Sequence, residues 1–165
     1  MFTITKEFHF SASHVLNGLP EGHQCGRVHG HNIVVRVELA AADLDETGMV
    51  LDYGQLAPLG KMIDELLDHR HLNDVVDFNP TAENFCRWIY QWCVTQFGWP
   101  VSRVGWSETP KTWAYYQANT GIGKADAPVT SSTGAGVTLT VNAVNPMAEA
   151  ETTIERVMRQ SRLLQ

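Results

Sequence analysis

Alternation of apolar and polar positions predicts strands near the start of the chain. In residues 2–10 apolar side chains occupy alternate positions, a period of two that is typical of a half-buried strand. Residues 31–39 are rich in β-branched side chains and predict a second strand. A turn at residues 45–48 precedes the apolar run at residues 49–53, which we expect to form a third strand that pairs as a hairpin.

A helical period replaces this alternation in two later segments. In residues 55–67 apolar side chains recur at intervals of three and four, which predicts an amphipathic helix with Pro58 in its first turn. A second helix is expected after Asn79-Pro80-Thr81, because Asn and Thr are favoured N-caps. Its expected buried positions, two core cysteines included, are Phe85, Cys86, Trp88, Ile89, Trp92, Cys93 and Phe97.

The end of the second helix divides the remaining sequence into two unlike parts. Residues 101–108 and 113–118 predict two more extended segments, so that helices inserted between antiparallel strands give an α+β domain over residues 1–118. From residue 119 the sequence becomes rich in Gly, Ser, Thr and Ala, as in a linker. We therefore predict a C-terminal extension over residues 119–165, with a candidate strand at 137–141 and a candidate helix at 147–164.

Charge and composition restrict the function. The 165 residues are 44% hydrophobic, enough for a core, and carry a formal net charge of −6. No Lys/Arg-rich run occurs, so a nucleic-acid or membrane-surface partner is not expected, and an anionic substrate would have to be held by a few local cations or a metal. Three cysteines, with no signal peptide and no apolar run of spanning length, predict a cytoplasmic protein.

Three histidines are candidate metal ligands. His29 and His31 are two residues apart, so on an extended strand both imidazoles lie on one face, and His14 can add a third nitrogen from a neighbouring strand. Three neutral nitrogen ligands suit zinc with one position left open for water or substrate. Cys25, four residues before His29, is either a fourth ligand that closes a structural site or a reactive thiolate beside the metal.

Several acidic residues have both a catalytic and a structural interpretation. Asp68 can orient the imidazole of His69 for proton transfer, or it can be a solvated residue beside a histidine at a helix end. Glu108 ends a predicted strand and can accept two parallel N–H bonds from a 2-amino-4-oxo heterocycle such as a pterin or guanine edge, or it can simply reach water. Thr81 and Glu83 can belong to the same pocket or only cap the second helix.

Six blocks of sequence follow one another in residues 2–118. They are Phe10-Ser-Ala-Ser-His14, Cys25-Gly-Arg-Val-His29-Gly-His31-Asn32, Gly48-Met-Val-Leu-Asp52-Tyr53, Leu67-Asp-His69-Arg-His-Leu-Asn73, Pro80-Thr-Ala-Glu-Asn84 and Glu108-Thr109. Together they resemble the 6-pyruvoyltetrahydropterin synthase and 6-carboxytetrahydropterin synthase family. The three-residue gap between Cys25 and His29 is similar to that of the bacterial 6-carboxytetrahydropterin synthases of queuosine biosynthesis.

The resemblance implies a fold and a set of residue roles. The fold is the T-fold, a four-stranded antiparallel sheet with two helices on one face, whose subunits assemble into a barrel as trimers or hexamers with active sites between chains. The implied roles are zinc binding by His14, His29 and His31, proton transfer by Cys25, Asp68 and His69, pterin anchoring by Glu108, and pocket lining by Thr81 and Glu83.

The implied activity is that of a zinc-dependent lyase. It converts 7,8-dihydroneopterin triphosphate to 6-carboxy-5,6,7,8-tetrahydropterin and releases acetaldehyde and triphosphate, a reaction of 7-deazaguanine biosynthesis. A 6-pyruvoyltetrahydropterin synthase, which eliminates triphosphate without cleaving the side chain, is the alternative enzyme. A non-catalytic pterin-binding module, with structural zinc closed by Cys25, is an alternative of another class.

Overall fold

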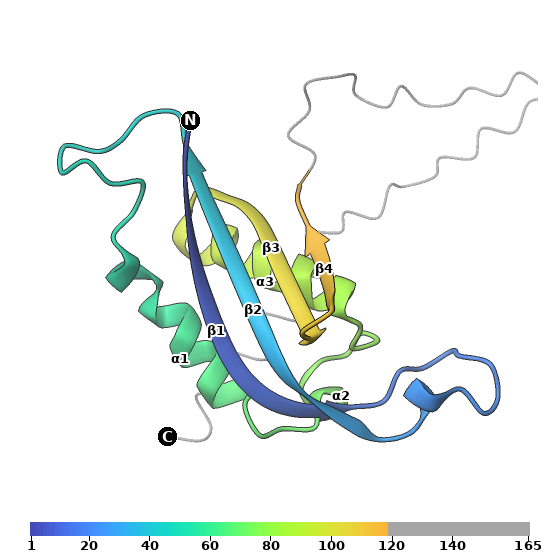
Figure 1. The fold of residues 1–165 in the computed structure, drawn as a ribbon. Helices are drawn as coiled ribbons and strands as arrows, with labels where there is room; N and C mark the ends of the chain where they lie inside the picture. Colours follow the sequence, from blue (N-terminus) through green and yellow to red (C-terminus); the bar gives the residue numbers. More distant parts are fainter. Residues whose placement is uncertain (119–165) are drawn as a thin grey trace, which may run out of the picture.

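The computed structural model describes residues 1–118 of the chain, whose fold is drawn in Figure 1. The predicted C-terminal extension, with its candidate strand at 137–141 and candidate helix at 147–164, lies outside the described residues. Its boundary with the preceding domain therefore stays a prediction. Within residues 1–118, no helix is long and apolar enough to cross a membrane.

Four antiparallel strands form one sheet in the order β1-β2-β3-β4. β1 (Phe2–His14) and β2 (His29–Ala41) pair along their whole length. β3 (Val101–Thr109) pairs with the other side of β2, and β4 (Thr112–Tyr116) forms the far edge (Figure 1). The first two strands extend farther than their alternation predicted, and both reach a histidine of the candidate metal site.

Two helices cover one face of the sheet. α1 (Ala57–Leu66) packs against β1, and α3 (Ala82–Phe97) packs against β3 and β4 (Figure 1). Thr81 is the N-cap of α3, and its hydroxyl accepts a hydrogen bond from the Asn84 backbone N–H at 3.3 Å. Gly98 ends the helix at φ 62°, a left-handed conformation that glycine adopts without a steric penalty. The predicted α+β arrangement of strands and helices is confirmed.

The predicted third strand at residues 49–53 is wrong. β2 already pairs with β1 on one side and with β3 on the other, so it has no free edge for a hairpin partner. Instead, the Asp45 carboxylate closes the turn by accepting hydrogen bonds from two backbone N–H groups that follow it. The chain then enters the short helix η2 (Tyr53–Leu56), which leads into α1. A second short helix that was not predicted, α2 (Leu72–Val75), follows α1.

The core lies between the sheet and the two helices. Phe85 of α3 stacks on Trp106 of β3 with their ring centroids 4.5 Å apart, and Phe10 of β1 meets the edge of the same indole. These aromatic rings therefore join α3 to the inner strand β3 and to the edge strand β1. Cys86 and Cys93 are buried on α3, as their positions predicted. β2 supplies the apolar row Ile33, Val35, Val37 and Leu39.

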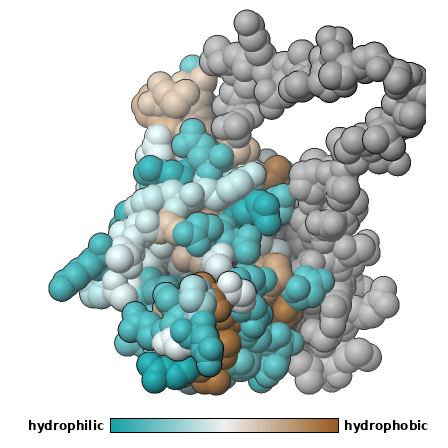
Figure 2. All heavy atoms as spheres, turned by 90° about the vertical axis from the view of Figure 1, so that its right-hand side faces the viewer, coloured by the Kyte–Doolittle hydropathy of each residue, from teal (hydrophilic) through white to brown (hydrophobic). Residues whose placement is uncertain are grey.

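The other face of the sheet, called here the open face, is polar. Two arginine–glutamate pairs cross it: the Arg36–Glu7 nitrogen–oxygen distance is 2.6 Å, and the Arg103–Glu38 distance is 2.7 Å. Each guanidinium also lies over an aromatic ring of β4. The side of the molecule drawn in Figure 2 is likewise mostly hydrophilic, with hydrophobic residues in smaller groups. The sheet thus has an apolar face toward the helices and a charged face away from them.

Replacing Phe85 with Ala is expected to lower the free energy of unfolding by about 3–5 kcal/mol, because the change removes a buried stacked ring and leaves a cavity. Urea unfolding followed by tryptophan fluorescence measures this change. The control is Val94→Ala on the exposed side of the same helix, which should change the free energy by about 0.5 kcal/mol or less. Equal costs for the two variants would contradict the stacked core.

Candidate metal centre and active site

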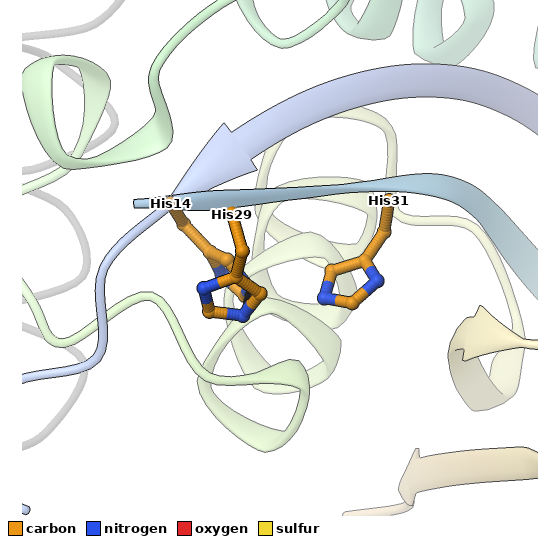
Figure 3. A group of neighbouring side chains, drawn as sticks. All are labelled: His14, His29 and His31. Atoms are coloured by element: carbon orange, nitrogen blue, oxygen red, sulfur yellow. Dashed lines mark hydrogen bonds between the residues drawn. The ribbon is translucent and has the colours of Figure 1, made fainter. Parts of the chain in front are cut away.

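The pairing of β1 with β2 brings three histidines to one end of the sheet. In this register His14 lies opposite His29, and Ala12 lies opposite His31. Directly opposed residues share a face of the sheet, and so do residues two apart on one strand. All three imidazoles therefore lie on the helix-covered face, and Figure 3 shows them gathered below the two strands.

Backbone carbonyls fix the orientation of two of these rings. Nδ1 of His14 donates a hydrogen bond to the Pro80 carbonyl oxygen at 2.9 Å, and Nδ1 of His29 donates to that of Arg27 at 2.7 Å. Because Nδ1 carries the proton in each neutral ring, Nε2 presents its lone pair. The two Nε2 atoms face each other at a distance of 3.1 Å. Two lone pairs so close are stabilised by a cation that both nitrogens can bind.

The electrostatics of His14 favour the neutral form that a metal ligand requires. Burial lowers the pKa of the His14 imidazole below its ordinary value, and the neighbouring His29 and His31 act in the same direction. The hydrogen bond with Pro80 and the Glu108 carboxylate act against this shift. His14 is 1% exposed, so desolvation is the main cause.

The three histidines form a group that can hold a metal ion. One ligand nitrogen from each ring lies within 4.8 Å of the others. This spacing is compatible with nitrogen–metal distances of about 2.0–2.1 Å, as in zinc sites. Three imidazole nitrogens leave a fourth position for a non-protein ligand. The donor set therefore fits the predicted zinc ion.

Cys25 lies in the loop between β1 and β2, within the short helix η1 (Gln24–Gly26). Its backbone N–H donates to Nδ1 of His23 at 3.1 Å, and its carbonyl accepts from the Leu16 N–H at 2.9 Å. Among residues 1–118, the group that can hold a metal consists of the three histidines without Cys25. The geometry therefore favours a separate, half-buried thiol over a fourth ligand that closes the site.

Glu108 lies beside the histidines, near the end of β3. Its carboxylate oxygens are 3.8 Å from Nε2 of His14 and 3.9 Å from Nε2 of His31, and its side chain is 25% exposed. It lines a pocket of about 290 Å³ together with Thr81 and Glu83. The structure thus brings together the three residues that were expected to share a pocket. Thr81 also caps α3, so its structural interpretation holds as well.

Asp68 and His69 form a hydrogen-bonded pair at the outer edge of β1. Nδ1 of His69 lies 2.8 Å from Oδ1 of Asp68, which also accepts the Ser11 backbone N–H at 3.0 Å. Both hydrogen bonds lower the pKa of the Asp68 carboxyl, and the bond from Ser11 is the larger cause. His69 has a φ of 57°, unusual for a residue other than glycine, and its side chain is 81% exposed. The imidazole is thus held by Asp68 and open to a ligand.

The sequence-predicted site residues fall into separate groups within one chain. The three histidines and Glu108 lie together, whereas no hydrogen bond or ion pair in residues 1–118 joins Cys25 or Glu108 to the Asp68–His69 pair. Two further polar residues, Arg70 and His71, follow this pair, and they line a pocket with His69. Sequence reasoning assigned them no role, although their place directly after Asp68-His69 was a signal.

Comparison with known proteins identifies the family. The model of the 6-pyruvoyl tetrahydropterin synthase family matches residues 3–119. The chain belongs to this family. The predicted family, and with it an enzyme of this type, is therefore confirmed.

Individual members of the family match the chain over half of its length or more. The 6-carboxy-5,6,7,8-tetrahydropterin synthase of Synechocystis sp. is 42% identical over 96 residues, which are 54% of this chain and 73% of that protein. The enzyme of the same name from Bacillus subtilis is 33% identical over 96 residues, 54% of this chain and 63% of that protein. The structure of 6-pyruvoyl tetrahydropterin synthase from Caenorhabditis elegans is 27% identical, with a TM-score of 0.63 over 71% of this chain and 95% of that one. This likeness confirms the predicted T-fold.

The purified protein is expected to bind an equimolar amount of zinc, and His29→Ala is expected to abolish this binding because one of three ligand nitrogens is lost. Equilibrium dialysis followed by atomic emission spectrometry measures the bound metal. His9→Ala is the matched control, since His9 is exposed on β1 and outside the group. Retention of equimolar zinc by His29→Ala would contradict the three-histidine site.

Asp68 is expected to stabilise the fold in a pH-dependent way. Its pKa is lower in the folded chain, so its contribution is present above the unfolded pKa of about 3.9 and is lost as the pH falls through the folded value. Asp68→Asn should therefore be less stable than the wild type at neutral pH, and the difference should shrink in acid. Thermal unfolding across this range tests the sign. A difference that grows on acidification would contradict it.

Proposed function

We propose that this protein is a zinc-dependent lyase that converts 7,8-dihydroneopterin triphosphate to 6-carboxy-5,6,7,8-tetrahydropterin. Acetaldehyde and triphosphate are the other products, and one water is taken up. The main support is the open group of three histidine nitrogens beside the Glu108 carboxylate, in a chain of this family. Relatives with the 6-carboxytetrahydropterin synthase name support the choice of product.

The site residues divide into those that bind the pterin and those that move protons. A zinc ion held by His14, His29 and His31 would polarise and acidify the side-chain hydroxyls of the substrate. Glu108 accepts N–H bonds from the 2-amino-4-oxo edge of the pterin, because a carboxylate complements two parallel donors. Thr81 and Glu83 line the pocket around this edge.

Proton transfer is assigned to Cys25, Asp68 and His69. Asp68 holds Nδ1 of His69 at 2.8 Å, which fixes the tautomer and leaves Nε2 free to take up or release a proton. The Cys25 thiol, half-buried in the loop between β1 and β2, serves as the second acid–base group. Both groups act on the substrate side chain rather than on the anchored end of the pterin.

We further propose that the complete site is shared between copies of the chain. Asp68 and His69 lie at the outer edge of β1, away from the pocket that Glu108 lines near β3 and β4. In an assembly of trimers or hexamers that closes the sheets into a barrel, one copy can supply the proton-transfer pair to the pterin pocket of another. The three free cysteines fit a cytoplasmic reaction of 7-deazaguanine and queuosine biosynthesis.

A 6-pyruvoyltetrahydropterin synthase is the second candidate. The family model and the structure from Caenorhabditis elegans carry this name, and elimination of triphosphate is common to both reactions. Incubation of the zinc-loaded protein with 7,8-dihydroneopterin triphosphate and mass spectrometry of the products separates the two. 6-Carboxytetrahydropterin with acetaldehyde supports the proposal, 6-pyruvoyltetrahydropterin supports the second candidate, and unchanged substrate supports a binding module.

Cys25→Ala is expected to lower the turnover rate by roughly 10²–10⁴-fold, because it removes a positioned acid–base group, while the bound zinc stays equimolar. Single-turnover kinetics and metal analysis measure the two quantities on the same preparation. Cys93→Ala is the matched control: burial in the core raises the pKa of this thiol and keeps it away from substrate. Unchanged turnover in Cys25→Ala, or loss of its zinc, would contradict the assigned role.

A further inference from the structure

A second pocket lies beside the outer edge of β1. The segment that follows α1 runs along this edge: the His69 N–H donates to the Ser11 carbonyl at 2.7 Å, and the Ser13 N–H donates to the Arg70 carbonyl at 3.0 Å. His71 pairs with Ser13 in a parallel bridge. The pocket between this segment and the strands has a volume of about 480 Å³, within the range of small-molecule sites.

The lining of this pocket is rich in hydrogen-bond donors, and none of the residues in 1–118 that line it is a carboxylate. Its polar residues are Ser11, Ser13, His31, Asn32, His69, Arg70 and His71. This composition contrasts with the chain as a whole, whose formal net charge is −6. Arg70 supplies a fixed positive charge in this lining, so the local field favours an anion.

Arg70 is the cation in this pocket that has no internal partner. Its side chain is exposed and makes no hydrogen bond or ion pair with any residue in 1–118, whereas Arg36 and Arg103 are each bound to a glutamate. An unpaired guanidinium keeps all of its N–H donors for a ligand. Its planar fork matches the oxygens of a phosphate group in a bidentate manner.

Two neighbouring side chains are able to donate hydrogen bonds to a ligand. The Ser11 hydroxyl donates to Oδ1 of Asn32 at 2.8 Å, which leaves the Asn32 amide NH₂ free to donate. Nδ1 of His71 lies 3.1 Å from the Ser13 hydroxyl. When this hydroxyl donates to Nδ1, the proton of the neutral ring is on Nε2, which can then donate to a ligand. Donors from two strands and from the edge segment thus surround one space.

We infer that this pocket binds the polyphosphate chain of the substrate, with Arg70 as its principal ligand and His71 and Asn32 as supporting donors. The inference rests on the proposed function for the identity of the phosphate-bearing molecule, but the anion site itself does not. His69 lines the same pocket, so a triphosphate held there lies next to the imidazole that is assigned to proton transfer.

The position of the pocket also indicates which substrate molecule it serves. Ser11 and Ser13 alternate with Ala12 and His14 along β1, so their side chains lie on the open face, opposite to the metal histidines. The lining also includes Ala12 and His31, whose side chains lie on the helix-covered face, so the pocket borders the metal site. Within residues 1–118 it shares no lining residue with the pocket of Glu108, so in the proposed assembly the triphosphate held here belongs to a pterin anchored by another copy.

Calorimetric titration of the zinc-loaded protein with inorganic triphosphate tests the anion site directly. Arg70→Gln is expected to weaken binding roughly 10- to 100-fold, because hydrogen bonds to a charged group are lost. Arg70→Lys should retain part of the affinity, and Lys61→Gln is the charge-matched control on the exposed surface of α1. No binding by the wild type, or equal affinity in Arg70→Gln, would overturn the inference.

Kinetics with two pterins distinguish the substrate from free triphosphate as the ligand. Arg70→Gln should raise KM for 7,8-dihydroneopterin triphosphate while inhibition by unphosphorylated 7,8-dihydroneopterin stays unchanged. An equal loss for both compounds would overturn the assignment to the phosphate chain. If the protein binds triphosphate through Arg70 but does not turn over the substrate, the anion site is supported and the proposed lyase is refuted. If it turns over the substrate but does not bind triphosphate through Arg70, the lyase is supported and the anion site is refuted.

Discussion

The register between β1 and β2 is the constraint on which the site depends. These two 13-residue strands pair from Phe2 with Ala41 to His14 with His29. A slip of one residue would turn one strand over and move His14 to the face opposite His29. The same slip would carry the apolar row of β1, which includes the buried Phe10 and Ala12, out of the core. Burial of that row therefore fixes the position of the metal ligands, and the geometry of the histidines is a consequence of core packing.

Much of the local structure was predictable because its signals are local. The alternation in residues 2–10, the helical period after Pro80 and the i, i+2 spacing of His29 and His31 each describe one element. The failure at residues 49–53 has a non-local cause, since both edges of β2 are taken by strands distant in sequence. A period of two shows that a segment can be a strand but not that a partner edge is free.

The functional residues likewise divide into those that local spacing predicts and those that depend on tertiary neighbours. The histidine ligands could be chosen from spacing, but the alternatives for Cys25 and Asp68 depended on tertiary neighbours. Asp68 is paired with His69 because the backbone N–H of Ser11 holds its carboxylate at the edge of β1. The left-handed φ of His69 is supported by the same edge, through its N–H bond to the Ser11 carbonyl. No pattern within Leu67-Asp-His69-Arg-His71 contains this information.

The two faces of the β1–β2 pair favour ligands of opposite charge. On the helix-covered face, the Nε2 lone pairs of His14 and His29 converge near the Glu108 carboxylate, so this end of the sheet is complementary to a cation. On the open face, donors such as Ser11 and Asn32 lie near Arg70, whose guanidinium has no partner within residues 1–118, and this surface is complementary to an anion. The net charge of −6 predicts neither site, because each depends on a few side chains ordered by hydrogen bonds. Since alternation along a strand points adjacent side chains to opposite faces, one pair of strands can present metal ligands such as His14 on one face and donors such as Ser11 on the other, with His31 bordering both sites.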